Sequence, residues 1–323
     1  GSWACGIPMY LWWCAFDQDR LAFSPYEWTS VERELGLFTS GGQPKPTARE
    51  LKAFADFQDS LPFDRLPPRQ VDATVLVSET EETWPTTQGA WLLSRKAGFD
   101  IAYARAEDPL PASRFYVLPS GERYGTYSRT AYFRALERAR AGATLLITLG
   151  NGATLSNLRE AAGVEVETLY QRPREVAATV GGVPVAFTEP QTRVVFAREA
   201  TTLVATADGQ PLMTERACGK GRVLFVNADL ERNAPLAGWP LYRLAAEKAN
   251  VTRRVRVADG SAGLTEHPAG DGTAIVVAVN YENRPLKAAV EVSGRVGRVW
   301  RGACDGRTLE AGPCDAAVFE VLE

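Results

Sequence analysis

The sequence contains a single histidine among its 323 residues, and this scarcity excludes much of hydrolytic chemistry. His267 lies between Glu266 and Pro268, far from the middle of the chain. Ser/His/Asp and Cys/His mechanisms need a histidine base beside the nucleophile. The middle of the chain therefore has no base for such a mechanism, and we interpret His267 as a surface residue.

Cysteine is also scarce and badly spaced for metal binding. The five cysteines are odd in number and form no CxxC pair, which argues against a zinc site and a full disulfide framework. Cys304 and Cys314 are close enough in sequence for one short bridge, but reduced thiols in a cytoplasm are favoured. We therefore expect a cytoplasmic protein. The five are Cys5, Cys14, Cys218, Cys304 and Cys314.

The sequence also lacks a large excess of one charge and any long apolar run. The 36 basic and 39 acidic residues give a net charge of −3, so nothing argues for nucleic acid or an anionic membrane as partner. The apolar opening is too short to cross a bilayer and is interrupted by Pro8. It also lacks the basic start and cleavage site of a signal peptide, although a signal upstream of residue 1 stays open.

The glycine clusters at 150–152 and 181–182 fit neither GxGxxG nor the P-loop pattern. The segment CGKGR, residues 218–222, is typical of a hairpin turn between two strands. We therefore expect no nucleotide, no other cofactor and no metal.

The chain opens on an almost continuously apolar run, residues 7–16, which predicts a strand covered on both faces. An aromatic-rich loop follows, and then Thr47 and Glu50 form a capping box that predicts a helix start. One strand and one helix cannot bury each other's apolar surface. We therefore expect residues 1–66 to dock on other polypeptide.

A proline-rich connector, residues 61–70, precedes a region in which strand and helix patterns alternate. This alternation predicts an open, mainly parallel sheet with helices on both faces over residues 67–250. The predicted strands are 73–77, 101–104, 115–118, 144–148, 202–205 and 222–226, and the predicted helices are 89–96, 128–141, 155–162 and 236–248. From about Val251 short alternating runs separated by turns predict a small β-sandwich over residues 251–323.

The α/β region resembles class I amidotransferase-like and flavodoxin-like domains, in which a nucleophile stands on the tight turn after a central strand. Pro119, Ser120 and Gly121 occupy that position, without a cysteine or a partner histidine. We predict a structural, non-catalytic copy. The alternative, hydrolysis through Ser120 or Cys218, is opposed by the missing histidine.

Aromatic and acidic residues cluster at the end of the opening run and in the loop behind it. Flat aromatic rings pack on sugar CH faces, and carboxylates accept hydrogen bonds from sugar hydroxyls. Since neighbouring strand residues point to opposite faces, only one of Trp12 and Trp13 can line a barrel mouth. The alternative is that these aromatic residues only pack between domains. The group consists of Trp12, Trp13, Asp17, Asp19, Tyr26 and Trp28.

Three segments carry a family resemblance: LWWCAFDQD, then SPYEW, then ERELGLFTSGGQPKPTARELKAF. Together they resemble the eighth strand, loop and eighth helix of the (β/α)₈ barrel in clan A glycoside hydrolases of families 5 and 42. The resemblance implies that Trp13, or else Trp12, lies against the sugar in the cleavage subsite. It also gives Asp17, Tyr26 and Trp28 as candidate substrate contacts.

The order of barrel end, α/β domain and β-sandwich is similar to trimeric family 42 β-galactosidases and multidomain family 5 β-mannosidase-like enzymes. The resemblance implies retaining hydrolysis of a β-glycoside by two glutamates about 5 Å apart. Because these stand at strands four and seven of the barrel, no catalytic residue is expected in this chain. The expected partners are an N-terminal barrel fragment, a carbohydrate and two further copies in a homotrimer. The alternative is a non-catalytic carbohydrate-binding or assembly module.

Overall fold

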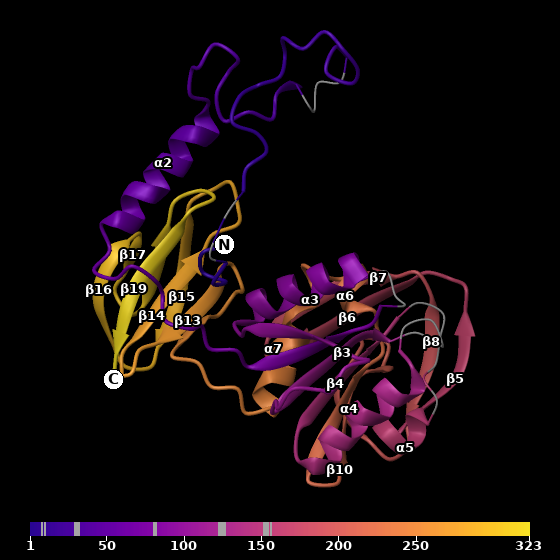
Figure 1. Ribbon diagram of the computed structural model, residues 1–323. Helices are drawn as coiled ribbons and strands as arrows, with labels where there is room; N and C mark the ends of the chain where they lie inside the picture. The colour runs from indigo at the N-terminus through magenta and orange to yellow at the C-terminus, as the bar shows by residue number, and fades with distance from the viewer. Residues whose placement is uncertain are drawn as a thin grey trace. The chain divides into compact units, whose positions relative to one another are not determined.

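The computed structural model describes residues 1–323 except 8, 10, 29–32, 80–82, 122–126, 151–154 and 156. The chain divides into two compact units, Gly1–Arg69 and Gln70–Glu323 (Figure 1). The second unit contains both an α/β part and a β-sandwich.

The first unit contains the helix α2, Pro46–Asp59, as the sequence predicts. The predicted capping box is wrong, because Lys45 is the N-cap residue and no side chain caps the helix. Pro46 occupies the first helical turn, where its missing N–H costs nothing and its fixed φ suits a helix. Thr47 therefore lies inside the first turn rather than before it.

The predicted strand over residues 7–16 is not formed in the described part of this segment. The backbone there consists of turns and irregular structure, and only Phe16 makes an isolated parallel bridge, to Phe38. A strand needs a neighbour that pairs its backbone groups, and among the described residues of 7–16 only Phe16 is bridged in this way. The apolar side chains of Ile7 and Leu11 are exposed.

The first unit also has almost no core. Among its described residues Ala4 is the one buried apolar side chain, and α2 buries none of its residues. Trp3 packs edge-on against the rings of Phe54 and Phe57 on α2. The apolar face of this segment is thus mostly uncovered by its own unit.

The α/β part is built on a seven-stranded sheet of order β2-β1-β3-β4-β11-β10-β9. The strands from β2 to β11 pair in parallel, and β10 and β9 add an antiparallel edge. This confirms the predicted open, mainly parallel sheet. In sheet order the bounds are Ile101–Arg105, Ala73–Val77, Phe115–Gly121, Thr144–Leu149, Gly221–Val226, Pro211–Cys218 and Thr201–Ala205.

Helices cover both faces of this sheet, with α3 and α6 on one side and α4 and α5 on the other (Figure 1). Two apolar clusters result, one under α3 and α7 and one under α4 and α5. The approach of α3 to α6 requires Gly89, because a Cβ there would lie 1.9 Å from the Glu231 carbonyl oxygen. The helices are α3 Thr83–Ala97, α4 Arg129–Ala141, α5 Leu158–Ala162, α6 Leu230–Asn233 and α7 Trp239–Lys248.

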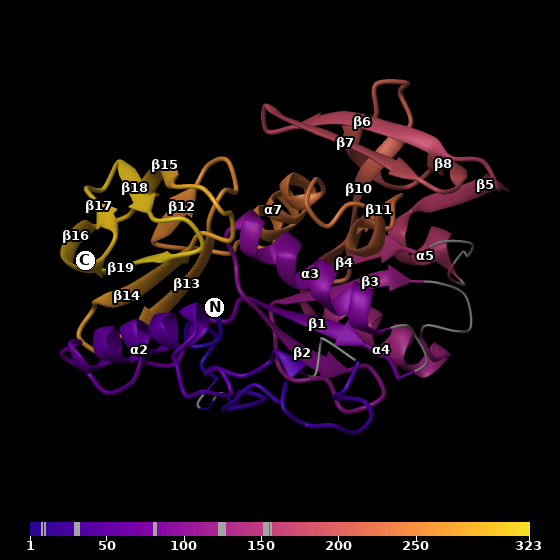
Figure 2. The ribbon, with the colours of Figure 1, turned by 90° about the horizontal axis from the view of Figure 1, so that it is seen from above.

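Two antiparallel ribbons stand between α5 and β9 in the chain. One pairs β5, Val164–Tyr170, with β8, Thr192–Ala197; the other pairs β6, Arg174–Val180, with β7, Val183–Glu189. Figure 2 shows them side by side. Because β8 contacts β10 and β6 contacts β9, the ribbons extend the antiparallel edge of the sheet.

Residues from Val255 onward form two four-stranded sheets around one apolar core that includes Val276, Leu309 and Phe319. This agrees with the sandwich that the alternating pattern predicts. The first sheet has β12 Val255–Val257, β15 Leu286–Val292, β18 Thr308–Ala311 and β17 Ala303–Cys304. The second has β13 Gly263–Pro268, β14 Ala274–Val279, β19 Ala316–Leu322 and β16 Arg295–Arg301.

The interpretation of His267 as a surface residue is wrong. Its side chain is 1% exposed, with Nε2 3.0 Å from the Thr265 hydroxyl oxygen. The strand β13 also contacts α3 outside the sandwich and is buried on both faces from Gly263 to His267. Sequence alternation could not reveal this second contact. All five cysteines are free, as expected, and no helix in the described ranges combines the length and apolarity of a membrane span.

Buried charged groups join the α/β part to the sandwich. Arg95 on α3 pairs with Asp100 at 2.8 Å and donates to the Leu264 carbonyl oxygen of β13 at 2.9 Å. Arg253 pairs with Asp72 just before β1, and both side chains are at most 5% exposed. A buried charge that loses its partner costs several kcal/mol, so these groups stabilise the junction only as complete sets.

We expect Arg95→Met to destabilise the second unit by about 3–5 kcal/mol, because Asp100 would keep a buried charge without that cation. Urea unfolding followed by circular dichroism measures the loss. Arg105→Met is the control, since the Arg105–Glu79 pair is about half exposed and should contribute less than about 1 kcal/mol. Equal effects of the two substitutions would contradict the importance of the buried pair.

Candidate functional site

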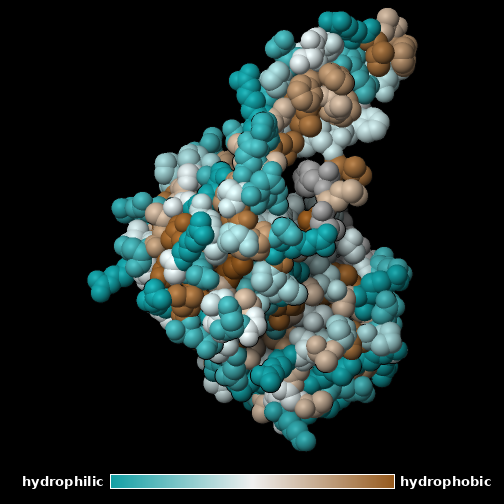
Figure 3. All heavy atoms as spheres, turned by 60° about the vertical axis from the view of Figure 1, so that its left-hand side comes forward, coloured by the Kyte–Doolittle hydropathy of each residue, from teal (hydrophilic) through white to brown (hydrophobic). Residues whose placement is uncertain are grey.

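The predicted sugar-binding residues of the first unit are mostly exposed. The side chains of Trp13 and Trp28 are 65% and 71% exposed, and Trp12 is 42% exposed. The Trp12 indole donates a hydrogen bond to the Leu35 carbonyl oxygen at 3.0 Å, which fixes the orientation of its ring. Tyr26 is partly buried and packs edge-on against Phe23. Apolar side chains gather on this segment, seen at the top of Figure 3.

Asp17 is held by its own unit. Its Oδ1 accepts hydrogen bonds from the Gly36 backbone N–H at 2.9 Å and from Lys45 Nζ at 2.8 Å. Lys45 also donates to the Glu34 carbonyl oxygen. Asp17 therefore ties the loop to the start of α2, a structural role that sequence reasoning did not assign to it.

The structure brings two of the five predicted residues to one place. Trp12 bonds Leu35 and Asp17 bonds the adjacent Gly36, so both are anchored on the same short segment. A side chain at Gly36 would collide with the Asp17 backbone nitrogen at 2.2 Å, so this close approach requires glycine. Trp13 follows Trp12 with its ring exposed, after which the Trp13–Cys14 peptide bond is cis.

A second group of polar side chains lies at the carboxyl ends of β3, β4 and β11. Ser120 is fully buried and has φ +47°, the left-handed conformation expected on a tight turn after a central strand. Its hydroxyl donates to Asp229 Oδ1 at 2.6 Å. Asp229 caps α6 and pairs with Arg232 at 2.7 Å.

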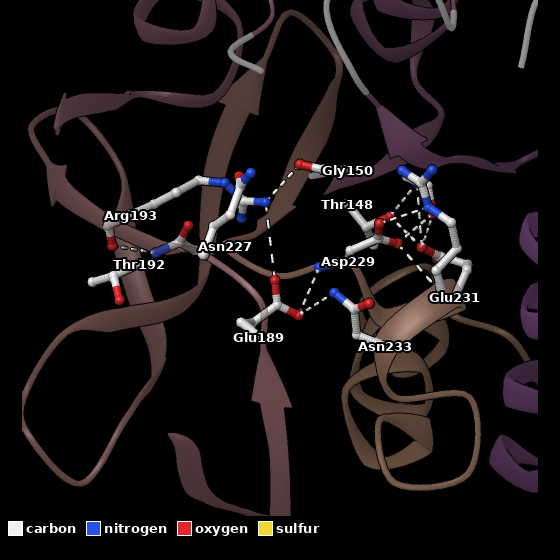
Figure 4. A network of polar contacts seen from close by, with 12 residues as sticks. Thr148, Gly150, Glu189, Thr192, Arg193, Asn227, Asp229, Glu231 and Asn233 are labelled. Carbon is white, nitrogen blue, oxygen red and sulfur yellow. Dashed lines mark hydrogen bonds and ion pairs between the residues drawn. The ribbon is translucent and has the colours of Figure 1, made fainter. Parts of the chain in front are cut away.

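Glu231 is the centre of this group (Figure 4). Its Oε2 accepts a hydrogen bond from the Thr148 hydroxyl at 2.6 Å, and its Oε1 accepts one from the Tyr242 hydroxyl. The Ser120 hydroxyl oxygen lies 3.1 Å from Oε2. Two strands and two helices thus converge on one carboxyl group that is 1% exposed.

Glu189 at the end of β7 extends the group toward the ribbons (Figure 4). It accepts hydrogen bonds from the Asn233 side chain at 3.1 Å and the Asp229 backbone N–H at 3.2 Å. Arg193 lies 3.9 Å away and donates to the Gly150 carbonyl oxygen. These contacts attach the β7 and β8 ribbons to the carboxyl edge of the sheet.

Burial changes the protonation of these acids. It raises the pKa of Glu231 to about 6, with a further rise from the Asp229 carboxylate, and raises the pKa of Glu189 to about 7. Burial likewise raises the pKa of Asp229, against the lowering effect of Arg232. The protonated forms are favoured because each carboxylate loses its hydration.

The serine position was predicted, but its carboxylate partners were not. Asp229 and Glu231 follow β11 directly, and a carboxylate after a parallel strand is the signal that could have found them. Glu79, which follows β1 at the same edge, is by contrast exposed and pairs with Arg105; Glu81 and Glu82 lie outside the described residues. Ser120 has carboxylates but no histidine beside it, and its hydroxyl is buried.

We expect the second unit to lose stability as pH rises from about 4.5 to about 7. A raised pKa in the folded state means that the folded protein binds the proton more tightly than the unfolded chain. The contribution of Glu231 and Glu189 to the free energy of unfolding is therefore complete below pH 4.5, the ordinary pKa of a glutamate. It decreases as the pH rises, until both carboxyl groups are ionised. Urea unfolding at pH 5 and pH 8 measures the difference.

Glu231→Gln should remove part of this pH dependence, on the order of 2 kcal/mol. Glu165→Gln on β5 is the control, because that side chain is 46% exposed. If the pH dependence of Glu231→Gln equals that of the unchanged protein, Glu231 is not the titrating group.

Among the residues that the structure describes, no group of three or more ligating side chains is placed to hold a metal ion. No family model matches the sequence, and no curated protein matches it.

Solved structures with similar folds include several glycoside hydrolases. A β-galactosidase from Bacillus circulans sp. alkalophilus matches with a TM-score of 0.62 and 14% identity. The match covers 88% of this chain and 47% of the β-galactosidase chain. The exo-β-1,4-mannosidase Op5Man5 from Opitutaceae bacterium strain TAV5 has a TM-score of 0.53 and 20% identity, covering 75% and 45%. An α-L-fucosidase isoenzyme from Paenibacillus thiaminolyticus has a TM-score of 0.59 and 13% identity, covering 87% and 53%.

The chain therefore spans about half the length of the structures it matches. At these identities the match concerns the fold. Within that limit the resemblance read from the sequence is confirmed: the chain has the fold of a part of glycoside hydrolases, among them a β-galactosidase and an exo-β-1,4-mannosidase.

Proposed function

We propose that this chain is the C-terminal portion of a retaining glycosidase that hydrolyses β-glycosides, and that its two catalytic glutamates stand on a (β/α)₈ barrel portion outside these residues. The observation that carries the proposal is the exposed apolar surface of the first unit. Trp13, Phe16 and Trp28 expose more than half of their side chains, and α2 buries no residue. Exposed apolar side chains gathered on one segment mark an interaction site (Figure 3).

The proposed occupant of this surface is the barrel. In the described part of residues 7–16 only Phe16 bridges a neighbouring segment, and the neighbouring strands of a barrel would supply the pairing that a buried strand needs. The ion pair between Asp17 and Lys45 lies within this unit, and Lys45 also donates to the backbone carbonyl oxygen of Glu34. The apolar side chains are therefore left for the partner.

In this proposal Trp13 forms the aromatic wall of the sugar site and Trp12 is the alternative. The Trp12 indole is already tied to Leu35, whereas the Trp13 ring is the more exposed of the two. Tyr26 and Trp28 would line the approach to the site. Asp17 would act mainly by fixing the loop that carries these rings, since its Oδ1 is occupied by Gly36 and Lys45.

The sugar is not specified by this portion of the chain. The similar folds include a β-galactosidase, an exo-β-1,4-mannosidase and an α-L-fucosidase, so one architecture accompanies different substrates. We propose a β-glycoside on the resemblance of the opening segments. A panel of nitrophenyl galactosides, mannosides, glucosides and fucosides, assayed on the complete protein, tests this; activity on none of the β-glycosides would overturn it.

In the complete protein, Trp13→Ala should lower kcat/KM about tenfold or more while the fold is kept, because the sugar loses its stacking surface. Steady-state kinetics on the best nitrophenyl substrate measures the loss. Trp84→Ala is the matched control, since that tryptophan on α3 is 74% exposed but lies in the other unit. Unchanged kinetics for Trp13→Ala would mean that the aromatic wall is misassigned.

We also propose that the complete protein is a homotrimer, on the resemblance of its domain order to family 42 β-galactosidases. Sedimentation equilibrium of the active protein should give three times the mass of one complete copy. A concentration-independent monomer with full activity would contradict this part of the proposal and leave the glycosidase part intact.

A further inference from the structure

Two adjoining pockets lie at the amino edge of the central sheet, opposite the buried acids. Their volumes are about 740 Å³ and 300 Å³, and both are lined by Arg114, Ala249 and Asn250. Open α/β sheets usually bind ligands at the carboxyl edge. Here both pockets lie at the opposite edge, whereas Ser120, Asp229 and Glu231 at the described carboxyl edge are buried and hydrogen-bonded to one another.

The register of the parallel strands explains why basic residues meet in the smaller pocket. Thr144 of β4 pairs with Phe115 of β3 on one side and with Arg222 of β11 on the other. Arg114, immediately before β3, and Arg222 therefore stand on both sides of Thr144. Lys220 joins them from the β10–β11 turn, packed beside Gly142 at the end of α4.

The charged side chains that line the smaller pocket are all basic. Its lining contains three cations and no carboxylate: Arg114, Lys220 and Arg222. Arg222 pairs with Glu215, which also pairs with Lys248. Arg114 and Lys220 are exposed, and their side chains form no ion pair or hydrogen bond with the residues that the structure describes. In a protein of net charge −3, this pocket concentrates positive charge.

These cations are not needed to cap the helices that end here. Helix C-termini attract cations to their unpaired carbonyl groups. At the end of α4, however, the backbone carbonyl oxygens of Arg138 and Arg140 already accept hydrogen bonds, from the backbone N–H groups of Ala143 and Lys220. At the end of α7, the Ala245 and Glu247 carbonyl oxygens accept from the next backbone N–H groups. The cationic side chains are therefore available to a ligand.

The larger pocket continues from Arg114 and has a different character. Ala102, Pro111 and Val251 form apolar lining, and Thr74, Thr252 and the shared Asn250 add polar side chains. Its one carboxylate, Asp72, is held by Arg253 and so does not repel an anion strongly. This surface suits an uncharged, hydroxylated group attached to an anion.

We propose that this amino edge binds a small hydroxylated compound that carries a phosphate or sulfate ester. The oxyanion lies between Arg114 and Lys220 in the smaller pocket, and the remainder lies along the larger pocket. Arginine and lysine are the side chains best suited to hold such oxyanions. The proposal rests on the pocket and its charges and is independent of the proposed glycosidase function.

Isothermal titration of the protein at low salt tests the ligand class, with glucose 6-phosphate, glucose 6-sulfate, inorganic phosphate and glucose as probes. We expect at least one of the two esters to bind, inorganic phosphate to bind more weakly, and glucose not to bind at the same concentrations. Whichever ester binds more tightly identifies the oxyanion. Binding of glucose as tightly as the esters, or of no anion at all, would overturn the proposal.

The double substitution Arg114→Gln with Lys220→Gln should weaken ester binding at least about tenfold, because both charged hydrogen-bond donors are lost. The matched control is Arg295→Gln with Arg298→Gln, which removes the same charge from two exposed residues of β16. The control should bind normally, and an equal loss in both proteins would show only a general charge effect and overturn the site. Should the double variant fail to fold by circular dichroism, Lys220→Gln alone, in an exposed turn, must still weaken binding several-fold.

Discussion

The central parallel strands of the α/β part must be covered on both faces, and most of the second unit follows from this constraint. Strands β3 and β4 are buried along their whole length, so each needs helices on both sides. The two apolar clusters supply that cover, one with α3 and α7 and the other with α4 and α5. The chain then has to close the carboxyl edge of the sheet, where strand ends leave polar groups without partners.

The protein closes that edge with acids rather than with apolar side chains. Ser120, Thr148 and Tyr242 come from two strands and a helix, and they meet at Asp229 and Glu231. Such a network fixes the direction of each element because every donor has a particular acceptor. It also makes the unit sensitive to pH, since a buried carboxylate is costly when ionised. Ser120, on the tight turn after β3, is thus a junction in the fold.

The first unit presents the opposite situation. Its helix α2 buries none of its own residues, and the aromatic side chains before it are exposed. What order it has comes from a few polar anchors, of which Asp17 with Gly36 and Lys45 is the clearest. A segment so organised keeps a defined loop while leaving an apolar face for a partner. The proposed role at a barrel wall uses both properties.

The sequence alone predicted the parallel strands and the longer helices of the second unit, and it carries the resemblance to clan A glycoside hydrolases. It did not locate the strands β5 to β8 and β10 or the helix α6. Strands such as 73–77 and 144–148 could be predicted because their local apolar pattern matches the cover they receive. The position of Ser120 could be predicted because a tight turn after a central strand has a local signature.

Tertiary structure decided the contacts between residues that lie far apart in the sequence, which no local pattern contains. Asp229 and Glu231 lie more than one hundred residues from Ser120, and β13, which carries the buried His267, contacts α3 as well as the sandwich. The opening run was predicted as a strand from its apolar pattern, yet a strand exists only where neighbours pair its backbone, and the first unit gives Phe16 only one bridge.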